Sequence, residues 1–178
     1  MEPNLRHEVA VFAGGCFWCM EAVFSLFQGI VEIIPGYSGG CSPDPSYEEV
    51  CNGDTGHAEA IKITFDPTKI SYDQLLEIFF SSHDPTQLNR QGADIGTQYR
   101  SAIFFNTPLQ QTKAKAYIQK LEESNVFEDP IVTEIEPLEK FYNAEKYHHQ
   151  YFEKHPDKAY CQISIKPKVE KIHQKYKL

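Results

Sequence analysis

A short apolar segment near the start of the chain passes through two glycines into a helical pattern. Residues 9–13 (VAVFA) predict a buried strand, which Gly14 and Gly15 interrupt. From Cys16 onward, apolar residues recur at spacings of three and four, the period of a helix; they are Phe17, Met20, Phe24 and Phe27. Gly29 is a typical end for such a helix. The pattern therefore predicts a strand, a tight turn and a helix, with a cysteine at the turn.

The rest of the chain mixes strand patterns with helix patterns. Further strands are predicted at residues 31–34, 61–65, 101–105 and 131–135. Helices are predicted after the capping-box pair Ser71 and Gln74, after Thr107-Pro108, and over residues 138–154. Long polar loops are expected at 37–57 and 83–98, the first of them after a strand that Pro35-Gly36 ends. One sheet packed by helices, in the α+β class, accounts for this mixture.

The composition bounds the kind of protein that this chain can be. Its 178 residues favour one domain, and 41% hydrophobic with 24% charged residues is typical of a globular protein. The net charge of −8 disfavours binding to nucleic acid, whose backbone is also negative. No stretch reaches the roughly 18 apolar residues of a membrane span, and residues 1–10 show no secretory signal. We therefore expect a cytoplasmic protein.

The cysteine usage favours thiol chemistry over structural cross-linking. In the cytoplasm a disulfide is more often catalytic than structural, and five cysteines cannot form a closed set of pairs. Cys16 lies where a turn meets the start of a helix, and the unpaired N–H groups there favour an anion. We therefore expect a lowered pKa and a nucleophilic sulfur at Cys16. A buried structural cysteine is the alternative.

Two features next to Cys16 leave alternatives open. Phe17 and Trp18 could line a pocket for a small apolar group such as a methyl, or could belong to the core. Cys16 and Cys19 form a Cys-x-x-Cys pair, which is typical of thioredoxin-like dithiols. The pair could also be half of a zinc site, with the distant His148 and His149 as candidates, although a second pair of the usual spacing is lacking.

Five motifs follow one another along the chain. They are Gly15-Cys16-Phe17-Trp18, Gly36-Tyr37-Ser38-Gly39-Gly40, Pro45 to Cys51 followed by Gly53 to Glu59, His83-Asp84-Pro85-Thr86-Gln87, and Asp94-Ile95-Gly96-Thr97-Gln98-Tyr99-Arg100-Ser101. Together they resemble the A-type peptide methionine sulfoxide reductases, and the similarity runs from about Val9 to Cys161. This resemblance implies an α+β two-layer sandwich around a mixed sheet, with a ferredoxin-like core and long functional loops.

The resemblance also implies a reaction. The chain would reduce methionine-(S)-sulfoxide, free and in proteins, and so repair oxidised proteins. Cys16 would attack the sulfoxide sulfur, and Phe17 and Trp18 would receive the S-methyl group. The sulfoxide oxygen would be bound by Tyr47, Glu59 and Tyr99. Glu59 would donate the proton and Asp94 would support the same network. A carboxylic acid can donate near neutral pH only if burial raises its pKa.

The resemblance assigns recycling to a second thiol. The Cys16 sulfenic acid would condense with Cys161 to a disulfide, which thioredoxin would reduce, without a metal or an organic cofactor. Cys19 lies within helical reach of Cys16 and is the second candidate for the resolving thiol. Cys41 and Cys51 are expected to have no catalytic role.

The resemblance and the composition also predict how the chain is organised. We expect a single domain over residues 1–178 that works as a monomer. Its core would span about residues 9–161, and residues 162–178 would form a solvated tail without a further cysteine.

Overall fold

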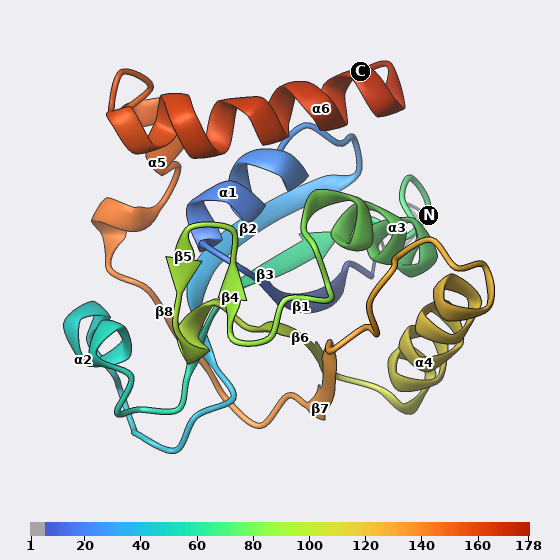
Figure 1. The fold of residues 1–178 in the computed structure, drawn as a ribbon, viewed down its shortest axis with the longest axis horizontal. Coiled ribbons are helices and arrows are strands. Elements are labelled where there is room, and N and C mark those ends of the chain that lie inside the picture. The colour runs from blue at the N-terminus through green and yellow to red at the C-terminus, as the bar shows by residue number, and fades with distance from the viewer. Residues whose placement is uncertain (1–5) are drawn as a thin grey trace.

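One six-stranded sheet organises the computed structural model, which describes residues 6–178. Its strands are β1 (Glu8–Gly14), β2 (Ile30–Ser38), β3 (Ala58–Phe65), β6 (Ser101–Phe105), β7 (Glu134–Pro137) and β8 (Phe141–Asn143). The order across the sheet is β7-β6-β1-β3-β2-β8 (Figure 1). Among these pairs only β6 and β7 run parallel, so the sheet is mixed. The short strands β4 (Arg90–Gln91) and β5 (Asp94–Ile95) form a separate hairpin.

The helices connect these strands in a ferredoxin-like order. They are α1 (Phe17–Phe24), α2 (Tyr47–Asn52), α3 (Tyr72–Ser82), α4 (Pro108–Glu123), α5 (Tyr151–Lys154) and α6 (Lys166–Tyr176). Short 3-10 turns lie at 97–99 and 146–148, and a π-helical turn at 161–165 leads into α6. The chain order β1-α1-β2-β3-α3-β6 with the sheet order β6-β1-β3-β2 is the split βαβ arrangement. The predicted α+β class is therefore confirmed.

Large apolar side chains fill the layer between the sheet and its helices. Phe12 on β1 and Ile61 and Ile63 on β3 are fully buried, and they pack in one cluster with residues of α1, α3 and α6. Figure 1 shows α6 lying across α1 on this side of the sheet. Burial of each such side chain stabilises the fold by about 1.5–3 kcal/mol. This packing fixes α1, and with it the cysteine at its start, on the sheet.

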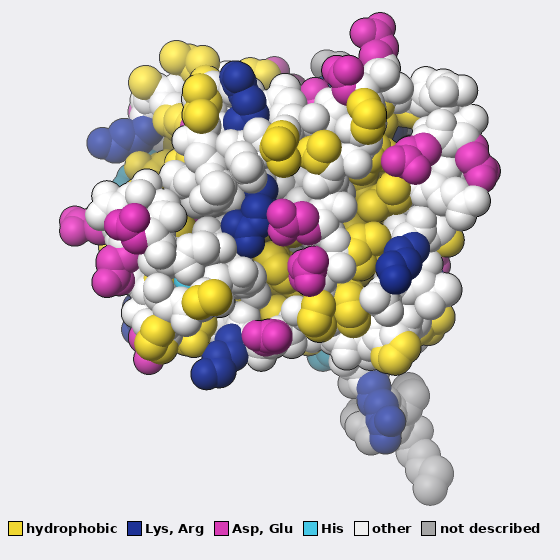
Figure 2. All heavy atoms as spheres, turned by 60° about the horizontal axis from the view of Figure 1, so that its bottom comes forward, with side chains coloured by type: hydrophobic (Ala, Val, Ile, Leu, Met, Phe, Trp, Pro, Cys, Tyr) yellow, Lys and Arg dark blue, Asp and Glu magenta, His cyan; other side chains and the backbone are white. Residues whose placement is uncertain are grey.

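The opposite face of the sheet carries smaller residues. Ala13, Ala60 and Ala102 are buried there, under a thin cover that includes Leu138 and Phe141. Figure 2, in which the underside of Figure 1 comes forward, shows hydrophobic side chains exposed between acidic and basic ones. Within residues 6–178, no helix is both long enough and apolar enough to cross a membrane.

The first helix and the strand after it end at other residues than expected. Helix α1 stops at Phe24, because the N–H groups of Leu26 and Phe27 bond back three residues and tighten the chain into a turn. Strand β2 continues through Pro35-Gly36 to Ser38. Proline is tolerated there because its carbonyl still accepts the N–H of Ala144 at 2.8 Å.

The segment 37–57, expected to be a loop, contains helix α2. Ser46 caps this helix by accepting the N–H of Glu49, and the Glu49 carboxylate accepts the N–H of Ser46 in return. The two residues are a capping box at the required spacing. The signal was therefore present in the sequence and outweighed by the surrounding glycines, serines and prolines.

The predicted helix over residues 138–154 is wrong. Residues 141–143 form β8, which pairs with Gly36, Tyr37 and Ser38 at the edge of the sheet. A strand edge offers this segment backbone partners that its own sequence does not reveal. Only the short helix α5 remains of the prediction. The strand expected at 131–135 lies at Glu134–Pro137, a shift of its boundaries.

The C-terminal segment is not a solvated tail. Residues 166–176 form α6, and Ile165 and Ile172 are buried in the main core. The apolar side chains of this segment recur at helical spacing on the face toward α1 and α3. The end of the chain is therefore part of the packing around the first helix.

Candidate active site

Cys16 caps the N-terminus of α1. Its backbone is extended (φ −60°, ψ 126°), and its carbonyl accepts the N–H groups of Cys19 and Met20. Gly15 before it has φ +92°, and a Cβ there would lie 2.8 Å from the side chain of Gln91. Glycine is needed because the backbone passes so close to β4. This turn fixes the sulfur-bearing residue at the start of the helix, where it is 6% exposed.

The protonation of Cys16 differs from the sequence-based expectation. Burial raises the pKa of its thiol well above the ordinary value, and a hydrogen bond with Cys19 and the charge of Glu59 act in the same direction. The expected lowering of this pKa is therefore wrong, because loss of water outweighs the position at a helix start. The same hydrogen bond lowers the pKa of Cys19. Of the two thiols, Cys16 holds its proton more tightly.

Glu59 lies on β3 beside the start of α1. Its side chain is buried, and its Oε2 accepts the backbone N–H of Phe17 at 3.0 Å. Burial raises the pKa of Glu59 to about 8, although this hydrogen bond acts in the opposite direction. A carboxyl with that pKa is mostly protonated at neutral pH. Oε2 accepts the Phe17 N–H, so the carboxyl in its acid form can offer its O–H through the other oxygen, Oε1.

Two phenols from separate segments lie within electrostatic range of the same carboxyl. Tyr47 is the first residue of α2, and Tyr99 ends the 3-10 turn at 97–99. Burial raises the pKa of each phenol, and the charge of Glu59 adds to both shifts. Both hydroxyls therefore keep their protons. The site offers two phenolic donors and one carboxylic acid, a set suited to an oxygen that gains negative charge.

Asp94 reaches the site through Tyr160. The Tyr160 hydroxyl donates to Asp94 Oδ2 at 2.7 Å and lies 4.0 Å from the sulfur of Cys19. The charge of Asp94 also contributes to the raised pKa of Glu59. Asp94 is thus an acceptor that orients a phenol beside the sulfur of Cys19.

Cys161 lies in the π-helical turn that leads into α6, in contact with α1. Its side chain is fully buried, and its pKa is raised first by burial and then by the charge of Cys19. Cys19 thus contributes to the raised pKa of both other thiols, Cys16 and Cys161. Cys161 lies outside hydrogen-bonding contact with Cys16 or Cys19, so it must move to form a disulfide.

The remaining cysteines differ in their surroundings. Cys41 is exposed in the loop after β2. Cys51 is half-buried on α2, and burial raises the pKa of its thiol. It lies on the same helix as Tyr47 and so borders the site, although the sequence motifs assign it no role.

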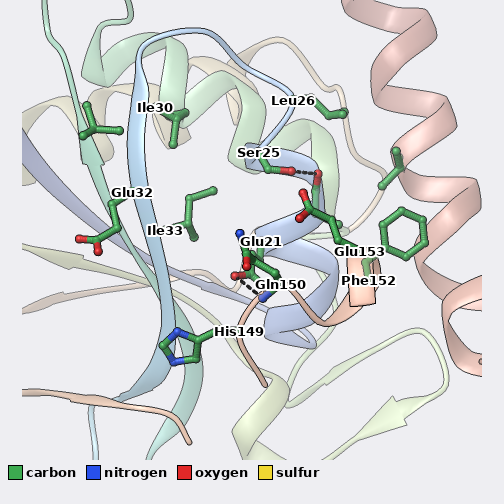
Figure 3. Close-up of a pocket in the computed structure, with 13 residues that line it drawn as sticks. Glu21, Ser25, Leu26, Ile30, Glu32, Ile33, His149, Gln150, Phe152 and Glu153 are labelled. Atoms are coloured by element: carbon green, nitrogen blue, oxygen red, sulfur yellow. Dashed lines mark hydrogen bonds between the residues drawn. The ribbon is translucent and has the colours of Figure 1, made fainter. Parts of the chain in front are cut away.

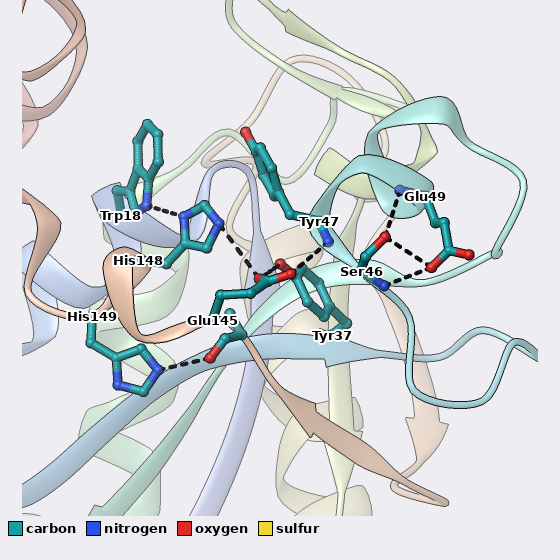
Figure 4. Close-up of polar contacts among 9 residues, drawn as sticks. Trp18, Tyr37, Ser46, Tyr47, Glu49, Glu145, His148 and His149 are labelled. Atoms are coloured by element: carbon teal, nitrogen blue, oxygen red, sulfur yellow. Dashed lines mark hydrogen bonds and ion pairs between the residues drawn. The ribbon is translucent and has the colours of Figure 1, made fainter.

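Phe17 and Trp18 form an aromatic wall at the start of α1. The ring of Trp18 stacks on Tyr151, with centroids 3.7 Å apart and planes 6° from parallel. Its indole N–H donates to His148 Nδ1 at 3.1 Å (Figure 4). Phe17 is buried and lies 5.0 Å from the same histidine ring. Contacts on several sides hold the indole in one orientation.

His148 connects this wall, through Glu145, to the side of the site that carries Tyr47. Burial lowers the pKa of His148 to about 4, so the ring is neutral, and its proton is on Nε2 because Nδ1 accepts from the indole. Nε2 faces the Glu145 carboxylate at 3.6 Å. Glu145 also accepts the hydroxyl of Tyr37 and the backbone N–H of Tyr47, each at 2.8 Å. One carboxylate therefore joins β2, α2 and the segment after β8 (Figure 4).

The comparisons with known proteins give one consistent answer. The family model described as peptide methionine sulfoxide reductase matches residues 8–178. The chain belongs to the peptide methionine sulfoxide reductase family. It is therefore an oxidoreductase that reduces methionine sulfoxide in peptides.

Individual members of the family match over nearly the whole chain. The peptide methionine sulfoxide reductase MsrA of Picrophilus torridus is 54% identical over 169 residues, covering 95% of this chain and 95% of that protein. The MsrA of Deinococcus radiodurans is 53% identical over 175 residues, covering 98% of this chain and 85% of that protein. The reduced form of Mxr1 from Saccharomyces cerevisiae has a similar structure, with a TM-score of 0.81, 34% identity and coverage of 90% and 92%.

Family membership also decides among the three possible roles of the Cys16-x-x-Cys19 pair, which are methionine sulfoxide reduction, dithiol exchange and zinc binding. A zinc site needs a cluster of ligands, and residues 6–178 contain no group of three or more His, Cys, Asp or Glu side chains placed to hold a metal ion. His148 bonds the indole of Trp18 instead.

The structure adds residues that the sequence motifs did not include. They are His148, Glu145, Tyr151 and Tyr160. All four follow the last motif, and Glu145, His148 and Tyr151 lie within residues 138–154, where the sequence predicts one continuous helix. No local pattern marks them, because each acts through a contact with a residue far away in the chain.

Proposed function

We propose that this enzyme reduces the S epimer of methionine sulfoxide, free and in proteins, with Cys16 as the nucleophile. The observation that carries the proposal is the pairing of a buried thiol at the start of α1 with a carboxylic acid of pKa about 8 on β3. A sulfoxide oxygen leaves sulfur only when it is protonated, and Glu59 is an acid that still holds its proton at neutral pH.

Three sides of the site would fix the substrate. Phe17 and Trp18 receive the S-methyl group, because both present aromatic surface next to the thiol. Tyr47, Tyr99 and the Oε1 side of Glu59 donate hydrogen bonds to the oxygen. Once the methyl group and the oxygen occupy separate places, the third substituent on the sulfur can point in one direction only. That constraint selects one epimer.

The first step transfers oxygen from substrate to enzyme. The sulfur of Cys16 attacks the sulfoxide sulfur while Glu59 gives its proton to the oxygen, and the thiol proton replaces the one that Glu59 gave. The sulfur–oxygen bond and the new bond between the two sulfur atoms then break as the hydroxyl passes to the sulfur of Cys16. Methionine leaves, and Cys16 is a sulfenic acid. The sulfoxide is reduced by two electrons and the thiol is oxidised by two, so no metal or organic cofactor is required.

The second step forms a disulfide and releases water. We propose Cys161 as the thiol that condenses with the sulfenic acid. Cys19 is the second candidate, favoured by its position on α1 three residues after Cys16. Thioredoxin then reduces the disulfide by thiol exchange; the solved complex of yeast Mxr1 with Trx2 supports a partner of this kind.

The cellular setting is part of the same proposal. We propose a monomer that works in the cytoplasm, where five unpaired cysteines would stay reduced between turnovers. The net charge of −8 favours protein and amino-acid substrates over nucleic acid. Repair of oxidised methionine in proteins is the resulting role.

Substituting Cys161 and Cys19 one at a time shows which of these two thiols is needed for recycling by thioredoxin. Cys161→Ser is expected to form about one methionine per enzyme and then to stop, because no disulfide is made for thioredoxin to reduce. Cys19→Ser is expected to cycle. Methionine formed without reductant and turnover with thioredoxin would be measured for both, with mass mapping of the disulfide in the unsubstituted enzyme. Normal cycling of Cys161→Ser together with a Cys16–Cys19 disulfide would reassign the resolving role to Cys19.

A further inference from the structure

A buried carboxylate on α1 lies outside the catalytic set described above. Glu21 is 6% exposed, and both of its oxygens accept the backbone N–H of Gln150, Oε1 at 3.0 Å and Oε2 at 2.9 Å. Figure 3 shows this contact at the wall of a cavity of about 540 Å³ on the side of α1 toward β2 and α5. A buried charge is retained only where its partners compensate for the loss of water.

The backbone that Glu21 holds is in an unfavourable conformation. Gln150 has φ +54° and ψ 39°, the left-handed region that residues with a side chain seldom adopt. Helix α5 starts at the next residue, and Gln150 gives it no side-chain cap. Such a conformation persists where surrounding contacts fix it. The carboxylate of Glu21 supplies that contact from another helix.

The segment held in this way makes the contacts that orient Trp18. Tyr151, next to Gln150, stacks on the indole at 3.7 Å, and His148, two residues before it, accepts the indole N–H at 3.1 Å. Trp18 and Glu21 are three residues apart on α1, hence on neighbouring positions of one helix face. The same helix therefore carries the indole and the anchor of the residues that pack on it.

We propose that Glu21 is a positioning residue for the methyl-binding wall, acting through Gln150 to hold Tyr151 and His148 against Trp18. The inference rests on the proposed function in one respect, namely that the substrate methyl lies against Trp18. A wall that contacts the methyl in the ground state and the transition state alike affects KM more than kcat. It also sets how well a methyl sulfoxide is distinguished from an ethyl sulfoxide.

The test compares Glu21→Ala and Glu21→Gln with the control Glu153→Gln in the full-length enzyme. Glu153 lines the same cavity but is exposed and makes no hydrogen bond to the 149–151 backbone among the described residues. For Glu21→Ala we expect a rise of about tenfold in KM for the S epimer of N-acetylmethionine sulfoxide, since one methyl in an apolar pocket changes binding by about that factor or more. We expect kcat to stay within about twofold. The preference for the methyl over the ethyl sulfoxide should fall.

Trp18 provides a readout that a general loss of stability would not reproduce. It is the only tryptophan of the chain, so the emission of the folded protein reports on the stacking with Tyr151 and the bond to His148. We expect a changed emission in Glu21→Ala, a smaller change in Glu21→Gln, which keeps one acceptor oxygen, and none in Glu153→Gln.

Each outcome decides the proposal. Unchanged emission with unchanged KM in Glu21→Ala would overturn it, as would equal changes in Glu153→Gln. If Glu21→Ala does not fold, Glu21→Gln decides, with an intermediate change supporting the anchor and values equal to the unsubstituted enzyme overturning it. If the unsubstituted enzyme reduced no sulfoxide, the proposed function would fail separately. The emission of Glu21→Ala against Glu153→Gln would then decide whether Glu21 orients Trp18.

Discussion

Replacing Cys16 with serine is expected to abolish methionine formation, with a fall in kcat of at least about 10⁴-fold, as for other enzymes that lose their nucleophile. A serine hydroxyl fits the same place at the start of α1 but is a far weaker nucleophile toward sulfur at neutral pH. It also cannot form a sulfenic acid, so the oxygen has no acceptor. The fold should be unaffected, because the turn depends on Gly15 and on the Cys16 backbone carbonyl.

The measurement is the yield of methionine from the separate S and R sulfoxide epimers in a single turnover without reductant. The unsubstituted enzyme should give methionine from the S epimer alone. Cys41→Ser serves as the control, because Cys41 is exposed in the loop after β2. Appreciable methionine from Cys16→Ser would show that another residue attacks the sulfoxide and would remove the basis of the proposed mechanism.

The sequence predicts the strand, turn and helix that carry Cys16 because local patterns specify each of these elements. The Gly-Gly-Cys turn and the helical spacing after it place Cys16 at a helix start, as observed. Alternation over 61–65 predicts the strand whose extension carries Glu59. The hydrogen bond from Phe17 to Glu59 joins residues that are 42 positions apart, and the sequence brings them together only through the resemblance to a family.

The protonation of Cys16 could not be predicted from local signals. A helix start lowers a thiol pKa, and this effect can be read from the turn and the helix pattern. Burial raises it, and burial depends on the helices and loops that cover α1, including α6. The second effect is the larger one here, and no sequence pattern near Cys16 reports it.

The residues that support the aromatic wall have no local sequence signal, for a related reason. Trp18 and its partner His148 are 130 residues apart, and the region around His148 was predicted to be a helix. The pairing of β8 with the edge of β2 overrides that local preference. It turns the following segment back over α1, where Tyr151 and Gln150 meet Trp18 and Glu21. The roles of these residues depend on how distant segments pack together, so no local sequence pattern predicts them.

Replacing Glu59 with glutamine is expected to lower kcat by about 10²–10⁴-fold, the usual contribution of a positioned proton donor. Glutamine is close to glutamate in shape, and its carbonyl oxygen can still accept the N–H of Phe17. The start of α1 should therefore stay in place. The amide cannot give up a proton, so the sulfoxide oxygen would leave without acid assistance. Binding of substrate should change less than kcat, since Tyr47 and Tyr99 still donate to the oxygen.

We expect the same carboxyl to set the pH dependence of the enzyme. Because the pKa of Glu59 is about 8, the acid form dominates below pH 8 and is lost as the pH rises through that value. The carboxylate that replaces it also keeps the pKa of Cys16 high, so its formation supplies no reactive thiolate. We therefore expect kcat/KM to be constant from about pH 6 to 7.5 and to fall about tenfold per unit above pH 8.

Single-turnover rates between pH 6 and 10 would be measured for the unsubstituted enzyme, for Glu59→Gln and for Glu32→Gln, which removes an exposed carboxylate from the neighbouring strand β2. Glu32→Gln should reproduce the fall above pH 8, because it leaves the buried acid unchanged. Glu59→Gln should be slow throughout and should lack that fall, because its side chain does not titrate. If Glu59→Gln kept the fall near pH 8, the group that titrates would be another one, and the phenols or Cys16 would have to provide the proton. If it reduced the sulfoxide at the normal rate, burial of this carboxyl would serve the structure of the site alone.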